Sequence, residues 1–172
     1  FKAFLGEWKK IYQIIPDFKL VVADMHTLLV DLRRWLEQVE LGVRSQPSAD
    51  RLRLEMDVIH DLLDPIIPSV APLLEKFEET ARSIPPDIQP AHRNYIKRFL
   101  HPVVLCSPFI HRTFQKPLGY AGDYEMVNMM LREPCEGGSM FAKILNVFFL
   151  KTAPVRAHQN RITYLVQQLV QE

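Results

Sequence analysis

The fold is decided by a stretch of chain that reads DFKLVVADMHTLLVDLRRWLEQVEL, residues 17–41. Its apolar residues recur at steps of three or four, which places them on one face of an α-helix. Asp17 follows Pro16 and is expected to cap the start of this helix, and Gly42 is expected to lie just beyond its end. The stretch therefore predicts one long amphipathic helix. Its apolar face consists of Val21, Met25, Leu28, Leu29, Leu32, Trp35, Leu36 and Val39.

The same helical spacing returns after Ser48 or Asp50 and continues to Phe77. Three prolines, Pro65, Pro68 and Pro72, lie within this second segment. Proline removes a backbone donor and clashes with the preceding turn of a helix. We therefore expect either two helices or one sharply kinked helix, broken near residues 65–68. Both segments together predict a long helical hairpin over residues 1–84.

A second helical subdomain is expected over residues 85–172. Residues 103–109 form a short apolar stretch, which is either another turn of helix or a buried extended segment. This stretch is the only plausible strand, and one strand cannot form a sheet. The sequence thus predicts an all-α fold, an irregular helical bundle in one domain, without a Rossmann sheet. Four further helices are expected. The first covers residues 91–100 and is ended or bent at His101-Pro102. The second covers residues 123–131 with Asp123 as N-cap, and the third covers residues 140–151 with Ser139 as N-cap. The last begins at Pro154.

Composition excludes several classes of protein. The chain has 172 residues, 48% of them hydrophobic, with a net charge of +1. A near-neutral chain is not expected to bind nucleic acid, which requires a basic surface. No apolar run approaches the ~20 residues of a membrane span. The 6 glycines are few for a complete Rossmann or P-loop domain, because such folds use glycine to approach phosphates.

Cysteine and histidine spacing predicts no metal site. Cys106 and Cys135 form no CxxC pair, and we expect two reduced, buried thiols in a cytoplasmic protein. The 6 histidines are scattered and match no metal-ligand pattern.

One short stretch, KPLGYAGDYE (residues 116–125), stands apart from the rest. Its glycines would let a tight loop approach a ligand. Its tyrosines could stack on a substrate, and its carboxylates could accept a proton. The same pattern also suits a purely structural loop with an N-cap and a first-turn acid. Both interpretations stay open for Gly119, Tyr120, Gly122, Asp123, Tyr124 and Glu125.

A second group of polar residues lies on the last predicted helix: Arg156, His158, Asn160 and Arg161. His158 and Arg161 are three residues apart and share a helix face. This face is either a solvated basic surface or a site for an anion or carboxylate, for which arginine offers a forked donor.

Four segments resemble one family: RTF (112–114), KPLGYAGDYEMV (116–127), GGSMFAK (137–143) and AHQNRI (157–162). They are similar to a group of bacterial class I S-adenosylmethionine-dependent methyltransferases. In that family a helical N-terminal region with a GYAGDYE-type motif precedes a Rossmann-like domain, and some relatives are linked to methyl esters of 3-hydroxy fatty acids. The similarity is close over residues 99–169.

This resemblance implies that the chain is the helical cap and substrate-recognition part of such an enzyme. S-adenosylmethionine would be bound by a C-terminal Rossmann-like domain of the same polypeptide, because the chain stops at Glu172 before the cofactor loop. We therefore read the chain as a fragment, which we expect neither to bind the cofactor nor to catalyse alone.

The resemblance also suggests roles for particular residues. Tyr120, Tyr124, Gly119 and Gly122 would line the acceptor, a small or fatty-acid-like carboxylate or hydroxyl. Arg161 would hold a carboxylate, which needs no base. Asp123, Glu125 and His158 are the candidate catalytic residues, and Glu125 or His158 would take the proton of a hydroxyl acceptor.

Two other functions are considered. The chain could be a dimerisation or sensory module whose helix over residues 17–41 pairs with a second copy, using Trp8, Trp35, Phe4, Phe18 and Tyr12. It could also enclose a lipid, given the flexible side chains of Met126, Met129 and Met130 and the phenylalanines Phe141, Phe148 and Phe149, although aromatic and methionine residues at helical spacing more often form core.

Overall fold

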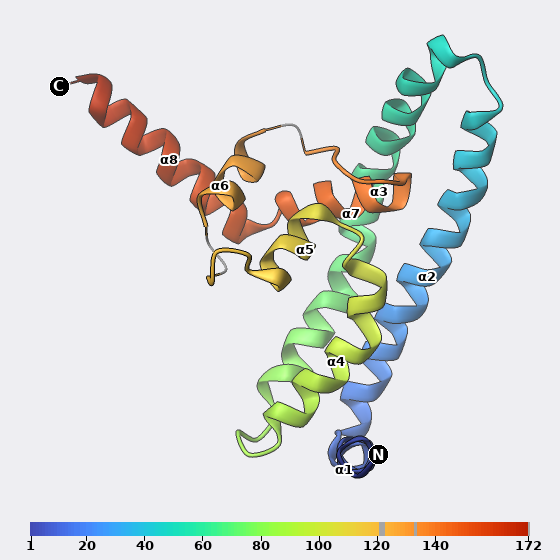
Figure 1. The fold of residues 1–172 in the computed structure, drawn as a ribbon, viewed down its shortest axis with the longest axis vertical. Helices are drawn as coiled ribbons and strands as arrows, with labels where there is room; N and C mark the ends of the chain where they lie inside the picture. The colour runs from blue at the N-terminus through green and yellow to red at the C-terminus, as the bar shows by residue number, and fades with distance from the viewer. Residues whose placement is uncertain (121–122, 133, 172) are drawn as a thin grey trace. The chain divides into compact units, whose positions relative to one another are not determined.

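The computed structural model describes residues 1–120, 123–132 and 134–171. Within these ranges the chain forms eight α-helices and one short 3-10 helix, and no strand (Figure 1). The all-α fold class is therefore confirmed. Residues 103–109 form a helix end, a turn and the start of the next helix, so of the two alternatives for this stretch the extended segment is wrong. No helix in the described part of the chain is both long and apolar enough to span a membrane.

The chain divides into two compact units. Unit 1 contains residues 1–35 and 64–103, and unit 2 contains residues 36–63 and 104–172. Each unit thus takes part of the predicted hairpin and part of the predicted second subdomain. The two units are described separately below.

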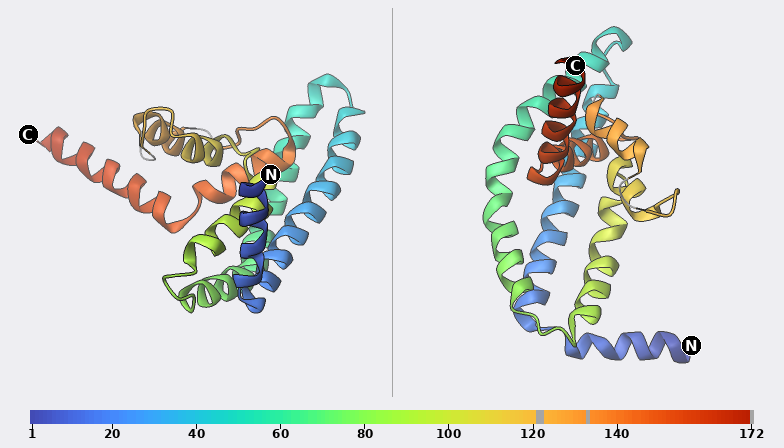
Figure 2. Two further views of the ribbon diagram at one scale, coloured as in Figure 1. Left: turned by 60° about the horizontal axis from the view of Figure 1, so that its bottom comes forward. Right: turned by 90° about the vertical axis from the view of Figure 1, so that its left-hand side faces the viewer.

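Unit 1 is built from α1 (Lys2–Lys9), η1 (Lys10–Gln13), the first part of α2 (Pro16–Arg44), the second part of α3 (Ser48–Arg82) and most of α4 (Gln89–Val104). These parts of α2, α3 and α4 lie side by side (Figures 1 and 2). Their core centres on Phe18, whose ring lies 5.7 Å from that of Phe77 and 4.9 Å from that of His92. The remaining buried members of this core are Ile14, Val21, Val22, Ile84, Ala91 and Leu100.

His92 is a core residue of unit 1. The backbone N–H of Ile15 donates to its Nε2 at 3.0 Å, and its Nδ1 lies 2.9 Å from the carbonyl oxygen of Ile88. Nε2 must accept and Nδ1 must donate, so the geometry selects the neutral ring with its proton on Nδ1. Both ring nitrogens are used, which explains how a polar side chain is tolerated in this core.

The bounds of α2 differ from the prediction. The helix begins at Pro16, so Asp17 lies in its first turn and the predicted N-cap is wrong. Proline suits the first helical position because its missing N–H has no helical partner there. The predicted end at Gly42 is also wrong, since the helix continues to Arg44. Pro47, rather than the glycine, supplies the stop, because proline disfavours the helical conformation of the residue before it.

The three prolines of α3 do not divide it. The helix is continuous from Ser48 to Arg82, so the two-helix alternative is wrong. Pro65, Pro68 and Pro72 are spaced by three and four residues and are all exposed. They therefore lie on the solvent side of the helix, where the carbonyl groups that lose a partner can bond to water. α4 likewise continues through Pro102 to Val104.

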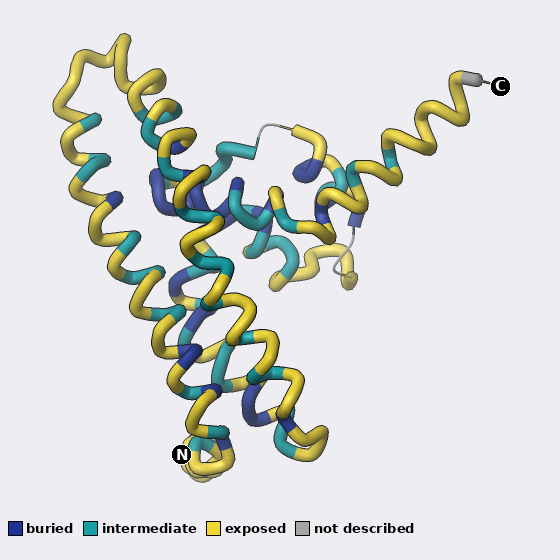
Figure 3. The backbone as a smooth tube through the Cα atoms, turned by 180° about the vertical axis from the view of Figure 1, so that it is seen from behind, coloured by how far each residue is buried: buried dark blue, intermediate teal, exposed yellow. Residues whose placement is uncertain are grey.

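Unit 2 contains the end of α2, the first part of α3, and α5 (Pro108–Gln115), α6 (Tyr124–Leu131), α7 (Met140–Leu150) and α8 (Ala153–Gln171). α7 is its central helix, and most of its residues are buried (Figure 3). Lys143 on α7 donates to Glu55 on α3 at 2.7 Å, and the N–H of Met140 donates to Glu40 on α2 at 3.4 Å. Met126, Met129, Met130 and Phe141 are buried in the core of this unit, as the structural interpretation of these residues expected.

Two predicted caps are confirmed. The side chain of Asp123 accepts from the N–H of Met126 at the start of α6, and that of Ser139 accepts from the N–H of Ala142 at the start of α7. The burial predicted for the cysteines is wrong, because Cys106 is exposed and Cys135 is only half-buried.

Candidate functional site

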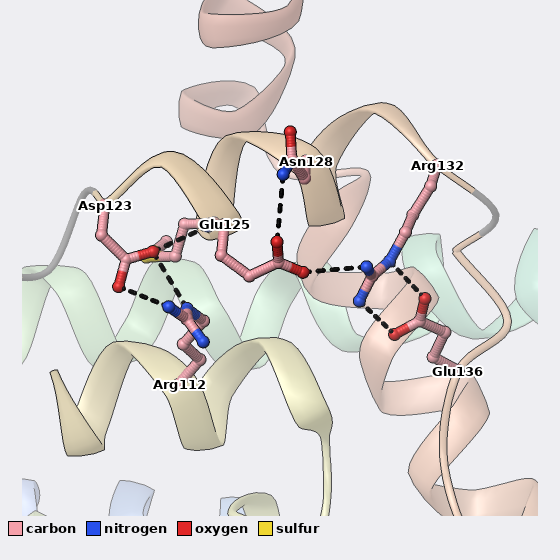
Figure 4. A network of polar contacts seen from close by, with 7 residues as sticks. Arg112, Asp123, Glu125, Asn128, Arg132 and Glu136 are labelled. Carbon is pink, nitrogen blue, oxygen red and sulfur yellow. Dashed lines mark hydrogen bonds and ion pairs between the residues drawn. The ribbon is translucent and has the colours of Figure 1, made fainter. Parts of the chain in front are cut away.

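The motif at residues 116–125 is held by an ion pair between α5 and α6. Arg112 donates to Asp123 through two parallel hydrogen bonds, Nε to Oδ1 and Nη2 to Oδ2, both 2.9 Å long (Figure 4). Oδ1 also accepts the N–H of Met126 at 3.0 Å. Asp123 is only 1% exposed. Its carboxylate therefore joins two helices and caps one of them.

Each partner of this pair stabilises the charged form of the other. The hydrogen bond from Arg112 holds the pKa of Asp123 below its usual value of 3.8, against the opposing effect of burial. The same bond raises the pKa of Arg112. Both partners are therefore ionised at neutral pH, and Asp123 is a weak base.

Glu125 belongs to a second polar group along the exposed side of α6. It accepts from the side-chain amide of Asn128 at 3.0 Å and from Arg132 at 2.9 Å, and Arg132 also donates to Glu136 at 3.1 Å (Figure 4). The hydrogen bond from Asn128 and the charge of Arg132 lower the pKa of Glu125. The motif thus contains two carboxylates, each already engaged by an arginine.

The loop before α6 presents its aromatic side chains to solvent. Lys116 adopts the left-handed conformation with φ 47° at the end of α5, and Gly119 follows with φ 87°. The N–H of Gly119 donates to the carbonyl of Lys116 at 2.8 Å, which closes the turn. Tyr120 and Tyr124 are exposed on either side of the ion-paired Asp123. Gly122 lies outside the described residues.

A buried hydrogen-bond cluster around Asn146 positions the start of α5. The side-chain oxygen of Asn146 accepts from the Ser107 hydroxyl at 2.9 Å and from the N–H of Phe109 at 3.0 Å. Its amide nitrogen donates to the carbonyl of Pro134 at 2.8 Å. Since α5 also carries Arg112, this cluster links α7 to the residue that holds Asp123.

Unit 2 also contains a cleft of about 210 Å³ between α6, the end of α7 and α8. Its lining includes three cationic side chains, Arg132, Lys151 and Arg156. Met130 and Leu150 supply apolar surface. Gln159 donates to the carbonyl of Met130 at 2.6 Å and so fixes α8 against α6. Within the described part of the chain, no carboxylate forms an ion pair with Lys151 or Arg156.

His158 and Arg161 lie elsewhere. Both are exposed on α8 and do not line the cleft. Neither forms a hydrogen bond or ion pair with a described residue of the motif. The structure therefore brings Asp123 and Glu125 together on α6, and brings Arg156 rather than Arg161 to the cleft.

The sequence patterns assigned no role to Arg112, Asn146 or Lys151. Arg112 lies in the RTF segment, 11 positions before Asp123. Asn146 lies on α7, whose side chains are almost all apolar, and Lys151 is the residue that follows the end of that helix. Isolated polar residues in the apolar stretch MFAKILNVFFL were the only signal for Asn146.

Comparisons with known proteins leave the family open. No family model matches the chain, and no curated protein or solved structure matches it significantly. No group of three or more His, Cys, Asp or Glu side chains suited to a metal ion occurs in residues 1–120, 123–132 and 134–171.

Proposed function

We propose that the chain is the helical acceptor-recognition domain of an S-adenosylmethionine-dependent methyltransferase, acting on a small or lipid-like carboxylate. The resemblance of the GYAGDYE segment suggests the enzyme class. The cleft of unit 2 is the single observation that carries the proposal, because it combines an apolar surface with two cations, Lys151 and Arg156, that form no ion pair with a described carboxylate.

The cleft suits the two chemical parts of such an acceptor. Lys151 and Arg156 would bind the carboxylate, for which arginine provides a planar pair of donors. Met130 and Leu150 would contact the adjoining hydrocarbon, and methionine adapts readily to flexible apolar ligands. An amphiphilic acid therefore fits this surface better than a neutral metabolite.

The motif's own carboxylates favour a carboxylate acceptor over a hydroxyl acceptor. A hydroxyl must lose a proton as it attacks, and a base with a lowered pKa accepts that proton poorly. The lowered pKa values of Asp123 and Glu125 make both of them weak bases. A carboxylate is already ionised at neutral pH and needs no base, so the protein's task is to position it and to exclude water.

Within this proposal Asp123 is a positioning residue and not a catalytic one. Its ion pair with Arg112 fixes the start of α6, where Tyr124 is the first residue. Tyr120 and Tyr124, both exposed, would contact the acceptor from this side. S-adenosylmethionine would supply the methyl group. The described residues contain no strand with a glycine-rich loop to hold it, so no residue of this chain is assigned to it.

The last part of α8, residues 162–171, has an apolar surface that could bind another domain of the same polypeptide. From Ile162 to Gln171 the helix carries no charged residue. Leu165, Leu169 and Val170 are exposed on it (Figure 3). An apolar surface of this kind is typical of an interface, and we assign it to the Rossmann-like domain that would bind the cofactor.

Calorimetric titration of the purified chain tests the acceptor site. We expect octanoate to bind and 1-octanol to bind much more weakly. Arg156→Gln should reduce octanoate affinity by roughly tenfold, because a charged hydrogen bond is lost. Arg161→Gln is the matched control on the same helix and should bind normally. Equal binding of octanoate by wild type and Arg156→Gln would contradict the proposed cleft.

The enzyme class needs a separate test. The whole reading frame that contains this chain should transfer radiolabel from S-adenosylmethionine to a fatty carboxylate. Tyr124→Ala should raise the KM for the acceptor without changing the KM for the methyl donor. Tyr12→Ala, which also removes an exposed tyrosine but lies in η1, should change neither. Absence of any methyl transfer would exclude the class, whether or not octanoate binds.

Exposed residues on α2 favour one alternative, a dimerisation module. Leu28 and Trp35 are seven residues apart and both exposed, so they lie on one helix face. Phe18, which the sequence also suggested for this surface, is buried in the core and unavailable. Sedimentation equilibrium at rising concentration would detect a dimer, and Trp35→Ser should abolish it if α2 forms the interface.

A further inference from the structure

The N-terminal helix α1 has an apolar face that is exposed in unit 1. Phe1, Phe4, Leu5 and Trp8 follow the spacing of one helix face. All four are exposed, with Phe4 at 60% and Trp8 at 47%, and Tyr12 in η1 is exposed as well. α1 runs across the direction of α2 rather than along it (Figures 1 and 2). A helix of eight residues is marginal in water by itself, so such a face is expected to have an occupant.

Positive charge accompanies these aromatic side chains. Lys2 and Lys9 are exposed and seven residues apart, so they lie on the same flank of the apolar face. The guanidinium of Arg98 on α4 lies 5.7 Å from the ring centre of Trp8. α4 adds no opposing charge, because residues 88–122 contain no Asp or Glu. α1 itself contains one acidic residue, Glu7, against the two lysines Lys2 and Lys9, so its sequence stays net positive. The surface formed by Phe1, Phe4, Leu5, Trp8, Lys2, Lys9 and Arg98 is called the α1 surface below.

We propose that the α1 surface binds the face of an anionic phospholipid bilayer. Phenylalanine, leucine and tryptophan insert at the boundary between headgroups and acyl chains, and flanking lysines bind anionic headgroups. Tryptophan prefers this boundary because its ring is amphipathic. Charge complementarity selects this occupant over a second copy of the chain, since two such surfaces would bring their lysines together.

The core of unit 1 explains how α1 can serve as an anchor. Ile14 is buried and directly follows η1, so it ties the short N-terminal segment to the start of α2. α1 itself contributes no buried residue among those described. Binding to a bilayer would therefore cover apolar surface without disturbing the core. This inference does not depend on the proposed function.

Tryptophan fluorescence gives a direct test, because Trp8 and Trp35 are the protein's 2 tryptophans. In the Trp35→Phe chain the emission reports on Trp8 alone. Vesicles of phosphatidylglycerol and phosphatidylcholine should shift this emission to the blue, and vesicles of phosphatidylcholine alone should shift it much less. Raising the salt concentration should weaken the binding, since it screens the lysines.

Single substitutions distinguish insertion of the α1 surface into the bilayer from non-specific binding of the protein to vesicles. Trp8→Ser should lower co-sedimentation with anionic vesicles by roughly tenfold, from the apolar surface it no longer buries. Trp35→Ser removes the same residue type, 50% exposed in the same unit, and should have no effect. Lys9→Glu should lower binding by roughly fivefold, whereas Lys76→Glu makes the same charge change on α3 and should not.

Two results would overturn the proposal. One is the absence of any vesicle-dependent shift of Trp8 emission. The other is a blue shift that grows with protein concentration and does not respond to vesicles, because a second copy of the chain would then cover the surface. Circular dichroism of Trp8→Ser should match wild type, since Trp8 lies outside the core.

Discussion

Arg112 and Asp123 form a bidentate ion pair that joins the middle of α5 to the first residue before α6, with both hydrogen bonds 2.9 Å long. The carboxylate is 1% exposed and also caps α6. One side chain thus bonds to α5 and also caps the start of α6.

Removing either partner should destabilise the protein, and removing both should cost less than the sum. Asp123→Asn or Arg112→Gln leaves the other charge without its partner, and we expect Tm to fall by roughly 5 °C. The double variant should show clear non-additivity. The exposed pair of Arg82 and Glu78, also 2.9 Å apart, is the control, and Arg82→Gln should change Tm by about 1 °C or less. Additive effects at Arg112 and Asp123 would refute the coupling.

Stability should depend on pH through Asp123. Its pKa is lower in the folded protein than the usual value of 3.8, because Arg112 donates hydrogen bonds to it. A group with a lowered folded pKa contributes fully above its unfolded pKa, and this contribution is lost as the pH falls through the folded pKa. Urea unfolding of wild type should therefore show a steep loss of free energy below about pH 4. Asp123→Asn should show a shallower loss, and parallel curves would contradict this assignment.

Asn146 should contribute more to the stability of the fold than an exposed asparagine does. Asn146→Ala would leave the buried Ser107 hydroxyl, the N–H of Phe109 and the carbonyl of Pro134 without their partner. We expect a loss of about 3 kcal/mol in the free energy of unfolding, measured with urea. Asn128→Ala removes the same side chain from an exposed position and should cost about 0.5 kcal/mol or less. Similar losses would show that the cluster contributes little.

Gly137 and Gly138 should respond differently to alanine. A Cβ at Gly137 would lie 2.8 Å from the Cβ of Ala142 and 2.8 Å from the backbone nitrogen of Lys143, and its φ is 154°. Gly138 has open space around it. We expect Gly137→Ala to cost about 2 kcal/mol and Gly138→Ala about 0.5 kcal/mol or less. Denaturant midpoints of the two variants give the comparison directly, and equal midpoints would contradict it.

Local sequence signals predicted helix starts best where a side chain bonds its own helix. Asp123 and Ser139 were predicted as caps and both accept an N–H three residues ahead. Such bonds depend only on neighbouring residues, so a short window of sequence contains the information. Asp17 is an aspartate like Asp123, but the helix already begins at Pro16. The prediction failed there because a proline suited to the first helical position directly precedes the aspartate suited to the cap.

The candidate site was predicted less completely. The sequence singled out Asp123, Glu125 and Arg156, but it gave Arg112 no role and did not point to Lys151. These residues meet through the packing of α5 on α6 and of α7 beside α8, which no local pattern encodes. Arg161 was chosen for its helix face, and that face points away from the cleft once Gln159 fixes α8 against Met130.

The sequence by itself determined the all-α class, the approximate helices and the unusual loop at residues 116–125, because apolar periodicity and caps are local properties of the chain. Only the tertiary structure decided that Asp123 forms an ion pair with Arg112, and that the prolines of α3 lie on its solvent side. It also decided that the apolar face of α1 stays uncovered in unit 1. The physical reason is that pairing, burial and exposure depend on which helices pack together, and that packing joins residues far apart in the sequence.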